Sequence, residues 1–271
     1  MVAAPDDLEN TSMLTLLINL DDATDRFANA AGALQREDIY FQRVEAVDGR
    51  GKLATEFPQY SERQASVFFG RPMTGGEIGC YLSHLNCLEI FLQSSAEYCL
   101  VLEDDMTLPD GSAKILAQLV AELNGSGCDW ELVNLGKAAR WPRSEIGSLE
   151  HYKVQHAHYF PVTTTGLLWT RNGAKALLDS GQLIYAPIDH FLRRLLTVRG
   201  TGIALSPALT PPSGASSTID TAADNGSEKS QQQARHGFSR TPYFLVREFR
   251  RQSYNYLAAL KGLVRNRIDR W

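Results

Sequence analysis

The segment Tyr98-Cys-Leu-Val-Leu-Glu-Asp-Asp105 decides the predicted fold, because an apolar run ends there in three carboxylates. An apolar run without polar alternation is typical of a strand that is covered on both faces. Ligands of open α/β sheets gather at the carboxyl ends of such strands, where Glu103, Asp104 and Asp105 should lie. The segment therefore predicts an α/β fold and also the edge of the sheet at which a site would form.

The acidic run itself points to a metal. Three successive carboxylates repel one another unless a cation compensates them. Successive residues of a strand point to opposite faces, so we expect Glu103 and Asp105 to share a face while Asp104 serves the other side. Oxygen ligands suit Mg²⁺ or Mn²⁺, which commonly take further ligands from substrate phosphates. The run thus predicts a divalent metal and a diphosphate; a polar loop that caps the following helix is the alternative.

Alternating patterns on both sides of this strand predict a three-layer α/β domain. The run Met13-Leu-Thr-Leu-Leu-Ile-Asn-Leu20 predicts a first buried strand, which is followed by a helix to about Arg36 and a second strand over 39–47. Thr74 precedes Glu77 by three residues, a capping-box pattern that opens a further helix. The other predicted elements are a short helix within loops at 50–73, helices at 112–123, 172–178 and 188–198, and strands at 130–135 and 165–170.

Composition fits a globular protein of one domain or slightly more. The 271 residues are 44% hydrophobic, enough to bury a sizeable core. The longest apolar stretch near the start spans about eight residues, against roughly 20 for a membrane helix, and acidic residues stand where a signal peptide would be basic. The four cysteines form no Cys-x-x-Cys pair, which favours reduced thiols over zinc or disulfide frameworks. A cytoplasmic protein is the expectation.

Charge is distributed unevenly along the chain. The net charge of −4 argues against general nucleic-acid binding. Residues 240–271 carry eight basic and two acidic residues, net +6, which leaves 19 basic and 29 acidic residues upstream. Residues 213–240, rich in Ser, Thr, Gln and Gly, predict a flexible linker, and 241–271 a basic amphipathic helical tail. We favour a tail that lies on an anionic membrane surface; docking onto the domain or a second copy is the alternative.

Three motifs stand at the centre of the chain: Thr74-Gly-Gly-Glu-Ile-Gly-Cys80, Ser83-His84 and Leu100-Val-Leu-Glu-Asp-Asp105. Together they resemble glycosyltransferase family 25, which includes bacterial lipooligosaccharide galactosyltransferases and collagen galactosyltransferases. The resemblance spans roughly residues 14–219 and extends to Ile18-Asn-Leu20, Asp25-Arg26, Val44-Glu-Ala-Val-Asp-Gly49, Thr165-Gly-Leu-Leu-Trp-Thr-Arg-Asn-Gly-Ala-Lys-Ala-Leu-Leu178 and Ala186-Pro-Ile-Asp189. The chain departs from the family pattern at Leu167, where the family usually has Tyr.

The resemblance implies a GT-A-like α/β/α nucleotide-sugar-binding domain over residues 1–212, with Mn²⁺ or Mg²⁺ at Glu103 and Asp105. It implies that a hexose, most commonly galactose, moves from a UDP-sugar to a saccharide or lipid-linked saccharide acceptor with inversion. Synthesis of lipopolysaccharide, lipooligosaccharide or another cell-surface glycan, at the cytoplasmic face of the inner membrane, would follow. The donor-binding residues that it implies are Asp25, Arg26, Asp48, Gly49, Asp104 and Gly166.

Three residues are candidates for the catalytic step. Asp189 follows Pro187 at the predicted start of a helix, where it could accept the proton of the acceptor hydroxyl or merely act as the N-cap. Glu77 could contact substrate through the Gly-Gly turn or serve only as half of its capping box. His84 lies two helical turns beyond Glu77 on the same face, facing the same cleft or filling a structural, hydrogen-bonded role.

Two other classes of function remain open at this point. A signalling receiver domain also holds Mg²⁺ at strand ends, and Asp21-Asp22 does follow the first strand, but the phospho-acceptor Asp and the later Lys of such domains are not evident. A catalytically silent sugar-binding or scaffold protein of the same fold is the other. Mn²⁺-dependent release of UDP from UDP-sugars separates the transferase from both.

Overall fold

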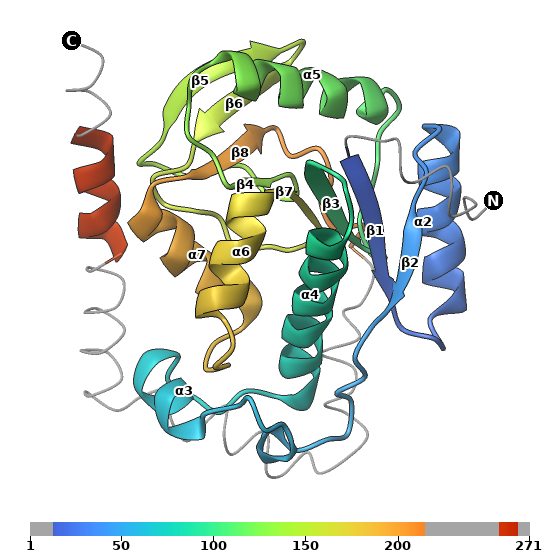
Figure 1. Cartoon of the computed structure of the whole chain (residues 1–271), viewed down its shortest axis with the longest axis vertical. Coiled ribbons are helices and arrows are strands. Elements are labelled where there is room, and N and C mark those ends of the chain that lie inside the picture. Colours follow the sequence, from blue (N-terminus) through green and yellow to red (C-terminus); the bar gives the residue numbers. More distant parts are fainter. Residues whose placement is uncertain (1–12, 215–254, 265–271) are drawn as a thin grey trace.

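The computed structural model of the chain describes residues 13–214 and 255–264 (Figure 1). One eight-stranded sheet runs through residues 13–214 in the order β2-β1-β3-β7-β4-β8-β6-β5. The strands are β1 (Met13–Asn19), β2 (Gln42–Glu45), β3 (Tyr98–Glu103), β4 (Leu132–Asn134), β5 (Ser144–Leu149), β6 (Tyr152–His156), β7 (Gly166–Thr170) and β8 (Gly202–Ser206).

The sheet is mixed, and this places several strand ends at one edge. β1 pairs in parallel with both β2 and β3, so the carboxyl ends of these three strands meet. β7 pairs antiparallel with β3, which brings its first residue, Gly166, opposite Leu102. The acidic run after β3 therefore lies at an edge that also holds the end of β1 and the start of β7.

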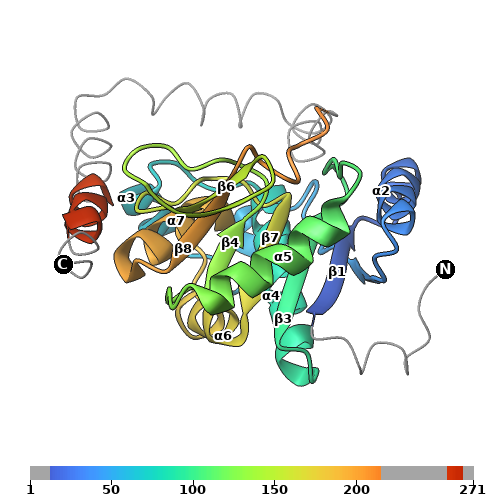
Figure 2. The ribbon, with the colours of Figure 1, turned by 90° about the horizontal axis from the view of Figure 1, so that it is seen from above.

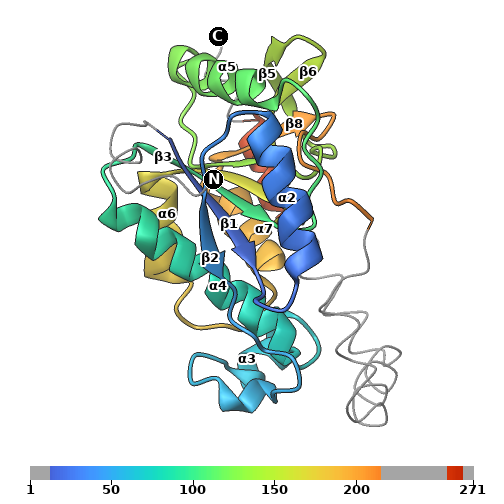
Figure 3. The ribbon, with the colours of Figure 1, turned by 90° about the vertical axis from the view of Figure 1, so that its right-hand side faces the viewer.

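Helices cover both faces of the sheet. They are α2 (Thr24–Arg36), α3 (Glu62–Phe68), α4 (Gly75–Gln93), α5 (Ser112–Gly125), α6 (Arg171–Ser180) and α7 (Ile188–Arg199), with a 3-10 turn η1 at Ala54–Glu56. Figure 1 shows α4, α6 and α7 in front of the strands, and Figure 3 shows α2 and α4 on opposite sides of β1. The predicted three-layer α/β class is thus confirmed.

The unbroken apolar runs of the sequence are explained by two cores, one on each face of the sheet. In β1, Leu16 and Ile18 pack into the core beneath α4, while Leu17 packs into the core beneath α2 and α5. β3 divides in the same way, with Val101 in the first core and Leu102 in the second. Because neither face of these strands meets water, the residues that point to either face are mostly apolar.

The predicted elements upstream of residue 200 are all present near their expected positions, and three strands were not foreseen. β5, β6 and β8 form the far edge of the sheet. β5 reads Ser-Glu-Ile-Gly-Ser-Leu, without a sustained apolar run, because it is the edge strand and only Leu149 in it is buried. Such a strand cannot be predicted from apolar runs in the sequence.

Residues 255–264 are helical and lie at the opposite end of the molecule from α2 (Figures 1 and 2). The ring of Tyr256 lies 5.6 Å from that of Trp141 and 6.1 Å from that of Tyr159, and Ala259 is fully buried. This part of the predicted tail therefore docks onto the domain. Most of the predicted linker and the rest of the tail lie outside the described residues. None of the described helices is both long and apolar enough to cross a bilayer.

Candidate active site

A pocket of about 140 Å³ opens where β1 and β3 end and α4 begins. The strand ends supply carboxylates and an amide, the loop after β2 supplies backbone, and α4 supplies one face of its first turns. Its lining residues are Ile18, Asn19, Leu20, Arg26, Ala46, Val47, Asp48, Gly49, Arg50, Gly76, Cys80, Ser83, His84, Glu103, Asp104 and Asp105. The pocket thus lies at the strand edge that the sequence predicted, and it includes all three members of the acidic run.

Asp104 is held by two side chains from β1 and α2. Nδ2 of Asn19 donates to Oδ2 of Asp104 at 2.7 Å, and Nε of Arg26 donates to Oδ1 at 3.0 Å. Nε of Arg43 in turn donates to Oδ1 of Asn19 at 3.0 Å, which fixes the orientation of the amide. The Asp104 side chain is only 4% exposed, so these donors take the place of water around its carboxylate.

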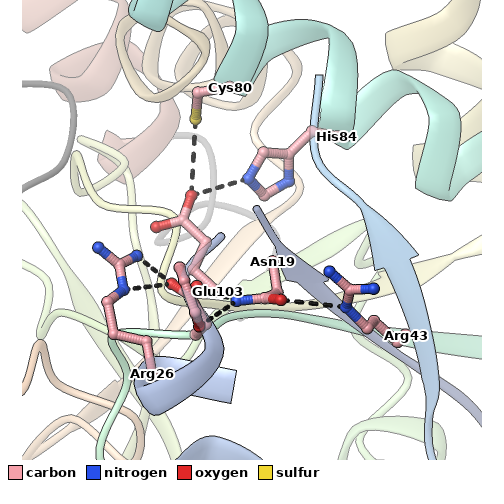
Figure 4. A network of polar contacts seen from close by, with 8 residues as sticks. Asn19, Arg26, Arg43, Cys80, His84 and Glu103 are labelled. Carbon is pink, nitrogen blue, oxygen red and sulfur yellow. Dashed lines mark hydrogen bonds and ion pairs between the residues drawn. The ribbon is translucent and has the colours of Figure 1, made fainter. Parts of the chain in front are cut away.

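Glu103 is held on the other side by two residues of α4. Nε2 of His84 lies 3.0 Å from Oε1 of Glu103, and Sγ of Cys80 lies 3.6 Å from the same oxygen (Figure 4). Burial opposes ionisation of Glu103, but hydrogen bonds and charge from His84, with smaller help from Thr164, give a net lowering of its pKa. Burial, with the nearby Glu103 carboxylate, raises the pKa of the Cys80 thiol well above its usual value.

Asp105 differs from Glu103 and Asp104 because one of its carboxylate oxygens is left unsatisfied among the described residues. Its Oδ1 is buried and finds no hydrogen-bond partner among the described residues. Burial, reinforced by the charge of Glu103, raises the pKa of Asp105 to about 6. A buried, unsatisfied carboxylate oxygen beside two other carboxylates fits an oxygen-liganded divalent cation, which would supply the missing partner.

The expected alternation of faces within the acidic run is wrong. β3 ends at Glu103, and Asp104 and Asp105 lie in a turn, so the two-residue period of a strand no longer applies after Glu103. All three carboxylates consequently line the same pocket, instead of Asp104 facing away.

The loop after β2 closes the pocket from the side of α4. The backbone N–H of Val47 donates to Oγ of Ser83 at 2.8 Å, and this hydroxyl donates to the carbonyl of Gly79 at 2.7 Å. A Cβ on Gly49 would stand 1.9 Å from the carbonyl oxygen of Gly75, and one on Gly79 would stand 2.3 Å from that of Val47. Glycines are therefore required here by backbone contact, since none of these three has a positive φ.

Asp48 lines the pocket through a small ion-pair cluster. Nη2 of Arg50 lies 2.7 Å from Oδ2 of Asp48, and Nη1 lies 2.9 Å from Oδ2 of Asp22. The hydrogen bonds from Arg50 lower the pKa of both carboxyl groups. The cluster keeps a guanidinium at the rim of the pocket, about where a phosphate could approach.

Besides Asp189, three of the predicted site residues do not line this pocket. The Glu77 carboxylate accepts from the N–H of Thr74 at 2.8 Å, completing the capping box of α4, and pairs with Arg71 at 2.5 Å. Asp25 is exposed in the first turn of α2. Gly166 is buried, and a Cβ there would stand 2.1 Å from Oγ1 of Thr210. The capping role of Glu77 is observed, while the substrate roles of all three stay predictions.

Asp189 lies in the first turn of α7 and is not its N-cap, which is Pro187. Its Oδ1 accepts from the backbone N–H of His190 at 2.7 Å. Burial raises the pKa of Asp189, and the charge of Glu103 raises it further, while Asp189 in turn contributes to the raised pKa of Cys80. Asp189 is not among the residues that line the pocket, so its catalytic role stays a prediction.

Asn19 and Arg50 are among the polar lining residues that the sequence did not predict as site residues. Asn19 ends β1, and Arg50 follows the Asp48-Gly49 turn. The signal that could have found them is their position, because polar side chains at the carboxyl ends of parallel strands face a shared edge. No local pattern shows that Asn19 reaches a carboxylate 85 residues away.

A family model and individual relatives point to the same protein family. The model described as glycosyltransferase family 25 (LPS biosynthesis protein) matches residues 13–192. Procollagen galactosyltransferase 1 of Danio rerio is 30% identical over 186 residues, covering 65% of this chain and 30% of that protein. The probable inactive glycosyltransferase 25 family member 3 of Rattus norvegicus is 29% identical over 187 residues, covering 65% of this chain and 32% of that protein. The chain thus spans only about 30% of the length of these relatives.

Two solved structures are also similar. A fragment of TarS from S. aureus superimposes with a TM-score of 0.44 at 12% identity, covering 93% of this chain and 80% of that one. A glycosyltransferase involved in glycosylation of the major capsid of PBCV-1 superimposes with a TM-score of 0.40 at 12% identity, covering 78% and 97%. No conclusion about the site follows from either superposition.

Proposed function

Since the chain belongs to glycosyltransferase family 25, we propose that it transfers a hexose, galactose before others, from a UDP-sugar to a saccharide acceptor. The observation that carries the proposal is the convergence of Glu103, Asp104 and Asp105 on one pocket, where Asp105 Oδ1 has no partner among the described residues. Such a site fits a divalent cation together with the diphosphate of a nucleotide-sugar. Membership of the family makes a receiver domain untenable.

Different walls of the pocket would contact different parts of the donor and its metal. Glu103 and Asp105 would hold Mn²⁺ or Mg²⁺, which as a Lewis acid stabilises the charge of the departing diphosphate. Arg26 orients Asp104 for the nucleotide, and Arg50 at the rim offers its guanidinium to phosphate oxygens. The close contact of Gly49 with the first turn of α4 forms a wall of the pocket that would face the donor.

Asp189 is the proposed base for the acceptor. Its buried carboxylate would accept the proton of an acceptor hydroxyl while that oxygen bonds to the anomeric carbon and the bond to the diphosphate breaks, with inversion. The raised pKa of Asp189 supports this role, because burial makes a carboxylate a stronger base. The charge of Glu103 also contributes to raising the pKa of Asp189, which is consistent with a position near the acidic run.

An aromatic cluster between the end of α3 and the start of α7, the helix that carries Asp189, supports a saccharide acceptor. The rings of Phe69 and His190 meet edge to face at 5.1 Å, and those of Phe68 and Tyr185 do so at 5.1 Å. The Arg194 guanidinium stacks over Phe68 at 4.9 Å from the ring centre. Aromatic faces pack against the C–H faces of sugars and guanidinium groups bind anionic substituents, so this cluster suits a glycan.

The proposal includes a role in the synthesis of lipopolysaccharide or another cell-envelope glycan. It also includes contact of the tail with an anionic membrane. The basic character of residues 241–271 supports this contact. The docking of Tyr256 on Trp141 limits it, because that ring is already engaged. Deleting 241–271 should lower binding to anionic liposomes and leave donor hydrolysis in place; unchanged liposome binding would exclude the membrane role.

The decisive experiment is a donor screen with Mn²⁺ across UDP-, GDP- and CMP-sugars, read first by thermal shift and then by release of nucleotide. We expect UDP-galactose to give the largest shift and metal-dependent UDP release. A donor that binds but releases no nucleotide with any acceptor tried would instead support a catalytically silent sugar-binding protein. One relative of this chain carries the name of a probable inactive glycosyltransferase. No shift with any UDP-sugar would refute the proposed donor class.

A further inference from the structure

We propose that Cys80, His84 and Glu103 form a second metal site, which takes a thiophilic divalent cation such as Zn²⁺. The thiol and the imidazole lie one helical turn apart on α4, and both point at the carboxylate that ends β3 (Figure 4). One sulfur, one nitrogen and one oxygen lie within 4.8 Å of one another. The site does not depend on the proposed sugar transfer, because its evidence is the ligand geometry alone.

The separations of the donor atoms are close to those of a tetrahedral site. Zn²⁺ bonds of about 2.0–2.3 Å place neighbouring ligand atoms about 3.3–3.8 Å apart. Sγ of Cys80 lies 3.6 Å from Oε1 of Glu103, and Nε2 of His84 lies 3.0 Å from the same oxygen. Small rotations of these side chains are enough to admit the ion between them.

The ligand set selects the kind of metal. A thiolate and an imidazole favour Zn²⁺ and Co²⁺, whereas carboxylates and water suit Mg²⁺ and Mn²⁺. The all-oxygen environment of Asp105 and the mixed environment of Cys80 therefore prefer different ions. All three residues of the mixed set line the pocket, so a fourth position is open to water or to a ligand oxygen, as in zinc sites with three protein ligands.

The surroundings also set the expected strength of the site. Histidine ligands usually donate their second N–H to an acceptor, which fixes the ring and strengthens the bond to the metal. Nδ1 of His84 is buried without a hydrogen-bond partner in the part of the chain that the structure describes. Loss of such support weakens metal affinity roughly 10- to 100-fold, so we expect a site weaker than structural zinc centres.

Glu103 belongs to both sites, so a thiophilic metal that binds it should affect the binding of the other metal. An ion on Cys80 and His84 takes Oε1 of Glu103, the oxygen that these residues already contact. Zn²⁺ should therefore compete with the binding of Mn²⁺. The alternative reading of the same contacts is that Cys80 and His84 only donate hydrogen bonds that position Glu103, and the experiment distinguishes the two.

The test uses the metal-free, reduced full chain without an affinity tag, titrated with Co²⁺. We expect one equivalent of Co²⁺ to give a near-ultraviolet thiolate-to-cobalt charge-transfer band with the intense visible bands of four-coordinate cobalt, and Zn²⁺ to displace both. Cys80→Ser should abolish the charge-transfer band, while Cys128→Ser, which changes a thiol outside the cluster, should keep it. Absence of the band in the unmutated chain, or its persistence in Cys80→Ser, overturns the proposal.

A second measurement covers the case in which Cys80→Ser does not fold. X-ray absorption of the zinc-loaded, unmutated chain should show one sulfur neighbour at about 2.3 Å and a shell of nitrogen and oxygen neighbours. A shell of nitrogen and oxygen alone would show that Cys80 only positions Glu103. Neither readout requires donor or acceptor, so a negative result leaves the proposed transferase activity standing, and an inactive protein leaves this site standing.

Discussion

Nε of Arg26 donates to Oδ1 of Asp104 at 3.0 Å, joining the first turn of α2 to the turn after β3 across 78 residues of sequence. The Asp104 side chain is 4% exposed and that of Arg26 is 23% exposed, so the pair is sheltered from solvent on one side. A carboxylate this deeply buried needs its donors, since an uncompensated charge there is costly. The pair thus ties the stability of the domain to the shape of the pocket.

Replacement of Arg26 by Met should therefore destabilise the protein and weaken donor binding together. Loss of a hydrogen bond to a charged, buried group costs about 1.5–3 kcal/mol, which should appear in the urea midpoint. Arg36→Met is the matched control, because Arg36 is exposed in the last turn of the same helix. An equal loss in both variants would mean that the contact with Asp104 contributes nothing specific.

The affinity of the protein for Mn²⁺ should fall as the pH drops through about 6. The pKa of Asp105 is raised to about 6, chiefly by burial, so the group is protonated below that pH and the cation must displace a proton. The apparent Kd should then rise about tenfold for each pH unit below about 6. Calorimetric titration of the metal-free protein at several pH values measures this.

Asp105→Asn serves as the companion variant for that titration. It removes the charge without changing the size of the side chain, so it should weaken Mn²⁺ binding and metal-dependent activity by roughly 100-fold or more while the melting temperature stays near that of the unmutated chain. Asp110→Asn, at an exposed aspartate in the following loop, is the control. Mn²⁺ affinity that is independent of pH and insensitive to Asp105→Asn would place the metal elsewhere.

Asp189→Asn should separate donor binding from transfer. The amide cannot accept the proton of an acceptor hydroxyl, and general base catalysis typically contributes about 100- to 10,000-fold. We expect the rate of sugar transfer to fall by a factor in that range, with donor affinity unchanged by thermal shift. Asp179→Asn, at an exposed position on α6, is the control. If Asp189→Asn transfers sugar at the normal rate, the base is another residue.

Gly79→Ala should destabilise the domain, although alanine usually favours a helix. Its Cβ would stand 2.3 Å from the carbonyl oxygen of Val47, so α4 and the loop after β2 would have to separate. Overpacking of this kind costs about 1–3 kcal/mol or more. Gly125→Ala at the end of α5 meets no atom within 4 Å and should be neutral or stabilising by up to about 1 kcal/mol. Chemical unfolding of both variants makes the comparison, and equal stability would contradict the close approach.

The sequence by itself determined the central strands, the helices between them and the edge at which the site forms. Met13–Asn19 and Tyr98–Glu103 can be predicted because a strand that is covered on both faces is a nearly continuous apolar run. The capping box at Thr74 and Glu77 could also be predicted from the sequence, since its partners lie three residues apart. These are local patterns, and local patterns can be read from a single chain.

Only the tertiary structure decided how the polar residues pair. Asn19 and Arg26 reach Asp104 across 85 and 78 residues, and Cys80 and His84 reach Glu103 from a helix that packs on the strand. The turn after Glu103, which brings all three carboxylates to one pocket, breaks the period that the sequence reading had extended. Such pairings follow from the order and packing of strands and helices, which no periodicity encodes.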